Sequence, residues 1–276
     1  MKCADSIPLH RLAKQYQRLG IPMSRSTLTD LFHAAAEKLA PLWARLLQRI
    51  AQSDVVQADE TPMLMQSPHR RGYLWTFLSD ALIAFRFSPT RSGETPREVL
   101  GGSTGTLVVD AYTGYNRVTD VDGRTRAGCL AHVRRKFFEA LSTAPVEARR
   151  AMDLILEVYK VEHEAKERGI VRTAEHLALR HTCGRAAMGT LHVWLLGQKD
   201  AHPPKSPLGQ AISYALNQWP TLLHFLDDVR IPPDNNHAES ALRVVALGRN
   251  YAEFVIMRSM ANRGLAWAGS GRRGSA

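Results

Sequence analysis

The sequence has 276 residues, of which 45% are hydrophobic, so it can bury a sizeable core in one large domain or two modest ones. Its formal charge of +10 favours a polyanionic partner, with nucleic acid ahead of an anionic membrane. No apolar run approaches the roughly 20 residues that span a bilayer, and no signal-peptide pattern opens the chain, which argues against a membrane protein and predicts a soluble cytoplasmic one. Its three cysteines are widely spaced, which argues against a disulfide framework.

Residues 1–53 are predicted to form an N-terminal helical region. Apolar residues recur at helical spacing from residue 7 to residue 52, in stripes that a turn at Gly20–Ser24 separates. The turn and the helix start at Arg25 are compatible with a helix-turn-helix whose second helix, with Arg25, contacts DNA, and equally with a plain helical hairpin. Pro41 is expected to interrupt the second helix and to open another.

Residues 54–144 change to the period of strands, which are then followed by helices, and this order predicts a mixed α/β sheet core. The first three expected strands look like consecutive antiparallel neighbours. Strands are expected at 55–59, 73–78, 82–87, 105–110 and 126–130, with helices at 95–100 and 131–140.

The remainder of the chain is predicted to be mostly helical. Residues 145–230 read as an all-helical insertion in the α/β domain, because the helix expected within 231–255 comes after it and still needs a sheet to pack on. Residues 256–276 are rich in Gly, Ser and Arg and are predicted to form a loose tail.

Three carboxylates stand where elements of the expected core meet. Asp59 and Asp110 end two strands, and Glu239 lies in the first turn of a helix. Carboxylates that crowd together repel one another unless a cation is bound, and hard oxygen ligands suit Mg²⁺ or Mn²⁺. Two such ions about 3.5–4 Å apart can support in-line displacement at a phosphodiester, which fits a basic protein.

Each of these residues also has a purely structural interpretation. Asp59 and Asp110 could start turns after their strands. Glu239 has the spacing of a capping box with Asn236 and of an ion pair with Arg243. Cys129 and His132 form a C-x-x-H, but no second pair completes a zinc site, so metal is not expected there.

Five blocks of sequence together carry a resemblance to a known family. The blocks are Ala58–Pro62, Asp110–Asn116, Cys129–Phe138, Pro204–Pro207, and Asp234–Arg243 with Ala246–Arg249. In this order, over roughly residues 3–255, the chain resembles the insertion-sequence family 66 transposases, as a copy with atypical or truncated ends. The blocks are specific as a set, whereas each one alone is weak.

The resemblance implies an RNase H-like mixed-sheet core that a helical insertion interrupts before the last catalytic acid. Carried over by position, the catalytic and metal-binding triad is Asp59, Asp110 and Glu239, with two Mg²⁺ or Mn²⁺ ions as cofactor. The implied reaction is cleavage at the ends of a bacterial insertion sequence and joining of the freed 3′-hydroxyl to target DNA. Double-stranded DNA, other copies of the chain and accessory transposition proteins are the implied partners, at the nucleoid.

Several basic residues in these blocks are candidate DNA contacts. His132, Arg134, Arg135 and Lys136 begin a helix soon after Asp110 and could hold phosphates near the metals, or they could simply solvate the helix. Arg243 and Arg249 could likewise hold DNA beside Glu239, with surface ion pairs as the alternative. Three aromatic residues are expected to pack in the core rather than to stack on bases: Trp75, Tyr112 and Tyr115.

Two other functions agree with the same residues. The three acids would also support a metal-dependent DNA nuclease that performs no strand transfer. The positive charge and the N-terminal helices would also suit a DNA-binding remnant without catalysis.

Overall fold

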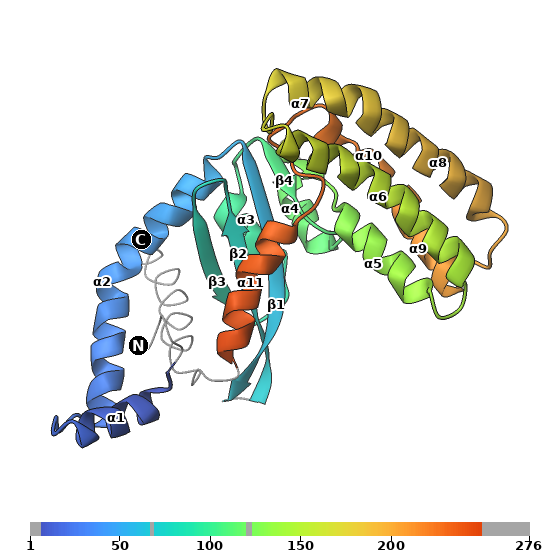
Figure 1. Ribbon diagram of the computed structural model, residues 1–276. Coiled ribbons are helices and arrows are strands. Elements are labelled where there is room, and N and C mark those ends of the chain that lie inside the picture. Colours follow the sequence, from blue (N-terminus) through green and yellow to red (C-terminus); the bar gives the residue numbers. More distant parts are fainter. Residues whose placement is uncertain (1–6, 67–68, 120–122, 250–276) are drawn as a thin grey trace, which may run out of the picture. The chain divides into compact units, whose positions relative to one another are not determined.

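The computed structural model describes residues 7–66, 69–119 and 123–249 (Figure 1). The chain divides into two compact units that exchange segments along the sequence. Unit 1 comprises Met1–Ser53, Ala58–Gly101 and His237–Ala276, and unit 2 comprises Asp54–Gln57 and Gly102–Asn236. Among the described residues, no helix combines the length and the apolar character needed to cross a bilayer.

Unit 1 contains the N-terminal helices, an antiparallel pair of strands and the last helix. Its elements are α1 (Leu9–Arg18), α2 (Arg25–Ala51), most of β1 (Val55–Gln66), β2 (His69–Leu78), β3 (Ile83–Ser88), α3 (Glu94–Leu100) and α11 (Asn236–Arg249). The expected helix at 95–100 is therefore confirmed as α3. Strands β2 and β3 pair antiparallel from Tyr73 opposite Ser88 to Leu78 opposite Ile83, as expected.

The N-terminal helices form a hairpin with a small core of its own. Leu9 and Leu12 of α1 pack against Leu28 of α2. Ser24 caps α2, because its hydroxyl oxygen accepts a 3.0 Å hydrogen bond from the backbone N–H of Thr27. Whether this hairpin works as a helix-turn-helix stays a prediction.

The expectation that Pro41 divides the second helix is wrong, because α2 continues through it to Ala51 as one bent helix (Figure 1). A proline inside a helix removes one backbone hydrogen bond and crowds the preceding turn. The next residues compensate by packing. The indole N–H of Trp43 donates a 2.8 Å hydrogen bond to the carbonyl oxygen of Phe85, and Leu47 and Ile50 are buried.

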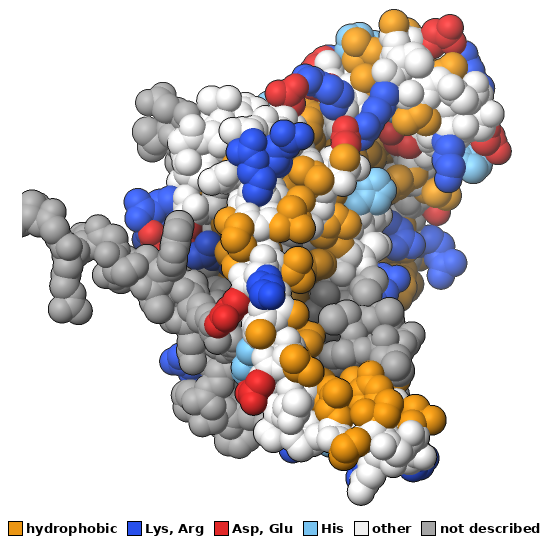
Figure 2. Space-filling view, turned by 90° about the vertical axis from the view of Figure 1, so that its left-hand side faces the viewer, with side chains coloured by type: hydrophobic (Ala, Val, Ile, Leu, Met, Phe, Trp, Pro, Cys, Tyr) orange, Lys and Arg blue, Asp and Glu red, His pale blue; other side chains and the backbone are white. Residues whose placement is uncertain are grey.

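One face of α2 remains exposed to solvent. Figure 2 looks onto this side of unit 1 and shows hydrophobic side chains at the surface among charged ones. Leu31, Leu39 and Leu42 of α2 keep 55%, 58% and 57% of their surface exposed. Within the described residues, α2 therefore buries only part of its apolar stripe and leaves the rest in contact with solvent.

Strand β1 is longer than the sequence pattern predicts, so Asp59 lies inside the strand and not at its end. Pro62, which cannot donate a backbone hydrogen bond to a neighbouring strand, also lies inside β1. The pairing of β1 with β4 ends at Gln57, so the proline falls beyond it and interrupts none of its hydrogen bonds.

Unit 2 holds the parallel part of the sheet and all helices of the insertion. Its strands are β4 (Thr106–Val108) and β5 (Thr125–Ala127), and the first residues of β1 pair parallel with β4 in the register Val55–Thr106 to Gln57–Val108. Strand β5 is also parallel to β4. The sheet order is β3-β2-β1-β4-β5, which confirms a mixed α/β protein.

A large apolar core joins the helices of unit 2 to its strands. Val108 of β4 and Ala127 of β5 belong to the same buried cluster as Phe137, Ile155 and Leu195. The helical elements are η1 (Thr113–Tyr115), α4 (Asn116–Thr119), α5 (Leu130–Ala140), α6 (Pro145–Glu167), α7 (Ala174–Leu179), η2 (Arg180–Gly184), α8 (Arg185–Lys199), α9 (Pro207–Asn217), α10 (Trp219–Leu222) and η3 (His224–Leu226).

The expectation that residues 145–230 are nearly all helical is confirmed by this series of helices. The strands expected at 105–110 and 126–130 are present but shorter. The division into five segments that the sequence suggests is a prediction that these units do not test.

Candidate active site

Asp110 lies two residues after the end of β4, at the carboxyl end of the parallel strands of unit 2. Its Oδ1 accepts a 2.9 Å hydrogen bond from the backbone N–H of Tyr112, so the side chain does start a turn. Its Oδ2 lies 4.0 Å from Nε2 of His132, which α5 carries in its first turn. One carboxylate oxygen thus shapes the backbone while the other faces an imidazole.

Arg126 of β5 organises the backbone around Asp110. Its guanidinium donates hydrogen bonds to the carbonyl oxygens of Asp110 and Tyr112, the latter at 2.9 Å, and to Oδ1 of Asn116 at 2.6 Å. A planar, always charged guanidinium fixes several acceptors in one geometry. Arg126 therefore holds both sides of the turn that presents the Asp110 carboxylate.

Tyr214 of α9 adds a phenol to the same neighbourhood in unit 2. Burial, together with the negative charge of Asp110, raises the pKa of Tyr214 to about 12, although a backbone hydrogen bond from Ala111 opposes the shift. The phenol therefore stays neutral near neutral pH and can act as a donor.

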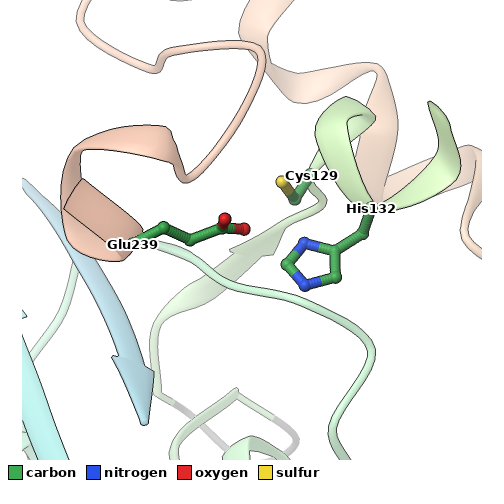
Figure 3. A group of neighbouring side chains, drawn as sticks. All are labelled: Cys129, His132 and Glu239. Carbon is green, nitrogen blue, oxygen red and sulfur yellow. The ribbon is translucent and has the colours of Figure 1, made fainter. Parts of the chain in front are cut away.

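Figure 3 shows Cys129 just before α5 and His132 on its first turn. The Cys129 side chain is buried, and burial raises the pKa of its thiol to about 12. A cysteine binds metal as the thiolate, so a metal at this position would have to displace the thiol proton. The backbone N–H of Asn235 donates to its sulfur at 3.2 Å, so Cys129 serves as a hydrogen-bond acceptor in unit 2.

Asp59 lies in β1, in unit 1, and is half-buried. The adjacent Glu60 has a side chain that is only 2% exposed and forms an ion pair with Arg91, in which Nη2 lies 2.6 Å from Oε1. Nε of Arg91 donates to the same oxygen at 2.7 Å. The carboxylate of Glu60 is thus held by Arg91, which lies in the residues after β3.

Glu239 lies in the first turn of α11 and is half-buried (Figure 3). An acidic side chain precedes this helix: Asp234 accepts a 3.0 Å hydrogen bond from the backbone N–H of Asn236. Leu242, one turn after Ala238, packs in unit 1 against Met63 of β1 and Leu74 of β2. The apolar stripe of α11 therefore rests on the sheet, as its spacing predicts.

The predicted DNA-contacting residues occupy different surroundings. Arg25 begins α2 and is exposed, and Arg243 is exposed on α11. Arg134, Arg135 and Lys136 are exposed on α5, where Lys136 also pairs with Glu139 at 3.3 Å. Arg249 ends α11, and its side chain lies outside the described residues.

Trp75 and Tyr115 are fully buried, which confirms that they pack in the core, and Tyr112 packs edge-on against Tyr115.

The sequence patterns missed three residues of unit 2: Arg126 and Tyr214 beside Asp110, and Tyr159, whose hydroxyl donates a 2.8 Å hydrogen bond to Oδ2 of Asp234. Arg126 could have been noticed as a charged residue inside an expected strand. Tyr159 and Tyr214 carry no signal in the sequence, because both lie on helices of the insertion at positions typical of core tyrosines.

Comparisons with known proteins agree over almost the whole chain. The uncharacterized protein y4jD of Sinorhizobium fredii is 31% identical over 274 residues, which cover 92% of this chain and 53% of the relative. The uncharacterized protein y4qI of the same organism is 28% identical over 274 residues, covering 92% and 50%. The chain thus spans about half the length of these curated relatives. Residues 1–263 match the family described as Transposase IS66 family, so the chain belongs to the IS66 family of transposases.

Proposed function

We propose that the chain forms the catalytic part of a DNA transposase that cuts and joins phosphodiester bonds with Asp59, Asp110 and Glu239. Membership of the transposase family supports DNA as the substrate. The sheet order β3-β2-β1-β4-β5, with β1, β4 and β5 parallel and β2 antiparallel to β3, supports an RNase H-like core.

One observation carries the assignment of the acids. Gln57 of β1 and Val108 of β4 are the last paired residues of two parallel neighbours in unit 2. Two residues further on come Asp59, inside β1, and Asp110, just after the end of β4. Residues level with each other on neighbouring parallel strands are candidates for a shared ligand.

The residues present suit a hard divalent cation. Carboxylate oxygens are the ligands that Mg²⁺ and Mn²⁺ prefer. Oδ1 of Asp110 accepts the N–H of Tyr112, so Oδ2, which lies 4.0 Å from Nε2 of His132, would be the oxygen that binds the metal. Asp59, Asp110 and Glu239 would hold the metal. When bound, two such ions activate the attacking water or 3′-hydroxyl and stabilise the leaving oxygen.

The chain's own groups have separate tasks in this proposal. Arg126 keeps the Asp110 turn in shape through the carbonyl oxygens of Asp110 and Tyr112. The exposed side chains of Arg134 and Arg135 supply positive charge on α5, after Asp110 in the sequence, and would contact DNA phosphates.

The variant Asp110→Asn distinguishes catalysis from a purely structural role. An asparagine oxygen can still accept the N–H of Tyr112, so the turn survives, but the negative charge that binds a divalent ion is lost. On a labelled duplex that carries the element end, with Mn²⁺, we expect Asp110→Asn to lower the rate of strand cleavage by at least about a hundredfold.

The control is Asp153→Asn, which makes the same change on an exposed position of α6 and should cleave at the parental rate. An Asp110→Asn chain as active as the parent would refute the proposed chemistry. Cleavage whose labelled 3′ end never joins target DNA would identify a nuclease instead, and salt-sensitive binding without cleavage in the parent would identify a DNA-binding remnant.

A further inference from the structure

The segment that leads from η3 to α11 is held by the helical insertion in unit 2. Arg180, which is 1% exposed at the start of η2, directs Nη1 at three carbonyl oxygens of this segment. These belong to Phe225, to Asp228 at 3.0 Å and to Ile231 at 3.1 Å. One buried guanidinium thus fixes the path of about seven residues.

Glu162 of α6 holds Arg180 in turn. Its two carboxylate oxygens accept hydrogen bonds from Nε and Nη2 of Arg180, each at 2.7 Å. A bidentate, buried pair of this kind restricts the guanidinium to one orientation. Glu162 belongs to α6 and Arg180 to η2, so both anchors of the segment lie in the insertion.

A second set of contacts holds the last residues before α11. The hydroxyl of Tyr159, also on α6, donates a 2.8 Å hydrogen bond to Oδ2 of Asp234. The other oxygen of Asp234 accepts the backbone N–H of Asn236, the first residue of α11. The backbone N–H of Asn235 donates to Cys129, and that of Leu130 donates to Pro233 at 3.0 Å.

These contacts form a chain of hydrogen bonds from the insertion to the helix start. Tyr159 orients Asp234, Asp234 fixes where α11 begins, and Glu239 follows three residues later along the sequence. Burial and the charge of Asp234 raise the pKa of Tyr159, so its hydroxyl keeps the proton that it donates.

We propose that Tyr159 and Arg180 are positioning residues for Glu239, and that the helical insertion serves to set the start of the helix that carries this acid. The inference deepens the proposed function and rests on it for the role of Glu239. It assigns to the insertion a task inside the reaction centre, in addition to any contact with DNA.

The test compares Tyr159→Phe with Tyr73→Phe in the full chain. Both remove one hydroxyl and keep the ring, but Tyr73 lies in β2 of unit 1. The first measurement is amide hydrogen exchange at Asn235 and Asn236. The second is the Mg²⁺ concentration that gives half-maximal strand cleavage.

We expect Tyr159→Phe to speed exchange at Asn235 and Asn236 by about fivefold to tenfold, the effect of losing one ordinary hydrogen bond. The half-maximal Mg²⁺ concentration should rise by a similar factor, while the maximal rate at saturating metal changes less. Peptides from α8 and α9 should exchange as in the parent. Tyr73→Phe should change neither measurement.

The double variant Tyr159→Phe with Asp234→Asn sharpens the result. If Tyr159 acts through Asp234, the two substitutions together should have little more effect than Asp234→Asn alone. Unchanged exchange at Asn235 and Asn236 in Tyr159→Phe, or equal acceleration throughout unit 2, would overturn the inference. A parent chain that never cleaves would refute the proposed function, and the exchange experiment would still decide whether Tyr159 sets the helix start.

Discussion

The helices of unit 1 and unit 2 are stabilised in different ways. In unit 1, α1 and α2 share a core of three buried leucines, Leu9, Leu12 and Leu28, while α2 leaves Leu31, Leu39 and Leu42 exposed. In unit 2, one continuous apolar cluster joins α5, α6, α8 and α9 to β4 and β5. The buried pair of Arg180 and Glu162 ties η2 to α6 as well.

The comparison shows that helix length is a poor guide to how firmly a helix is held. Helix α2 has 27 residues, yet much of its surface contacts solvent, whereas α8 has 15 and buries Met188, Leu191 and Leu195. Because burial of apolar surface supplies most of the stabilisation, chemically equal substitutions should cost more in unit 2 than in unit 1.

The largest effect is expected from Arg180→Met. It removes the guanidinium that donates to Glu162 and to three backbone carbonyl oxygens of unit 2, and breaking a buried ion pair costs about 3–5 kcal/mol. Hydrogen exchange in urea, read on peptides of unit 2, measures this loss in the free energy of unfolding. The control is Arg185→Met, which breaks an exposed pair with Asp227 and should cost at most about 1 kcal/mol. Equal losses in the two variants would contradict the role of Arg180.

A smaller difference is expected between two leucine truncations. Leu195→Ala removes a fully buried side chain from the cluster of unit 2 and should destabilise that unit by roughly 3 kcal/mol. Leu12→Ala in the small cluster of unit 1 should cost closer to 2 kcal/mol, since the neighbouring helices can collapse more easily around the gap. The same exchange experiment reports on both units. A larger loss for Leu12→Ala would reverse the comparison.

Acidification should weaken unit 2 through His176. Burial and the nearby charge of Arg180 lower the pKa of His176 below its ordinary value of 6.5, although Glu162 opposes the shift. As the pH falls below 6.5, the unfolded chain takes up this proton first, so the free energy of unfolding decreases with falling pH. In His176→Asn this loss should be smaller, because asparagine does not titrate while its oxygen can still accept the N–H of Arg172. Parallel pH profiles for parent and variant would exclude His176 as the source.

The smallest effect on stability is expected from Leu39→Gln on the exposed face of α2. The leucine keeps 58% of its surface in solvent, so the free energy of unfolding should change by no more than about 0.5 kcal/mol. Light scattering should show weaker self-association, because an exposed apolar stripe promotes non-specific contact. A destabilisation as large as that of Leu12→Ala would mean that α2 is packed on this face.

The sequence predicts the order and type of the elements well where local signals are strong. Helix α3, the antiparallel β2–β3 pair and the helical insertion follow from the apolar periodicity, and the start of α11 follows from Asp234 with two prolines before it. Proline was misleading at Pro41, because α2 continues through it and the packing of the following residues offsets its usual cost.

The candidate site could be predicted only in part. Asp59, Asp110 and Glu239 follow from strand ends, a helix start and the family blocks, and their shared role stays a proposal. Arg126 and Tyr159 could not be found in this way, because their partners lie 10 to 75 residues away along the chain and only the folded backbone brings them within hydrogen-bonding distance. Spacing rules describe neighbours on one element, not contacts between elements.

The π-helical segment Arg180–Gly184 has a consequence for how unit 2 tolerates changes in length. Its wider turn accommodates one more residue than a regular helix between the faces of α7 and α8. Deleting a single residue there would let the segment return to a regular helical turn and keep Met188 and Leu195 facing the core, whereas a deletion inside α8 before Met188 would turn both away by about 100°. The same deletion among residues 200–206, between α8 and α9, would also leave both helices facing as before, so the wide turn and the loop should tolerate the loss of one codon and the regular part of α8 should not.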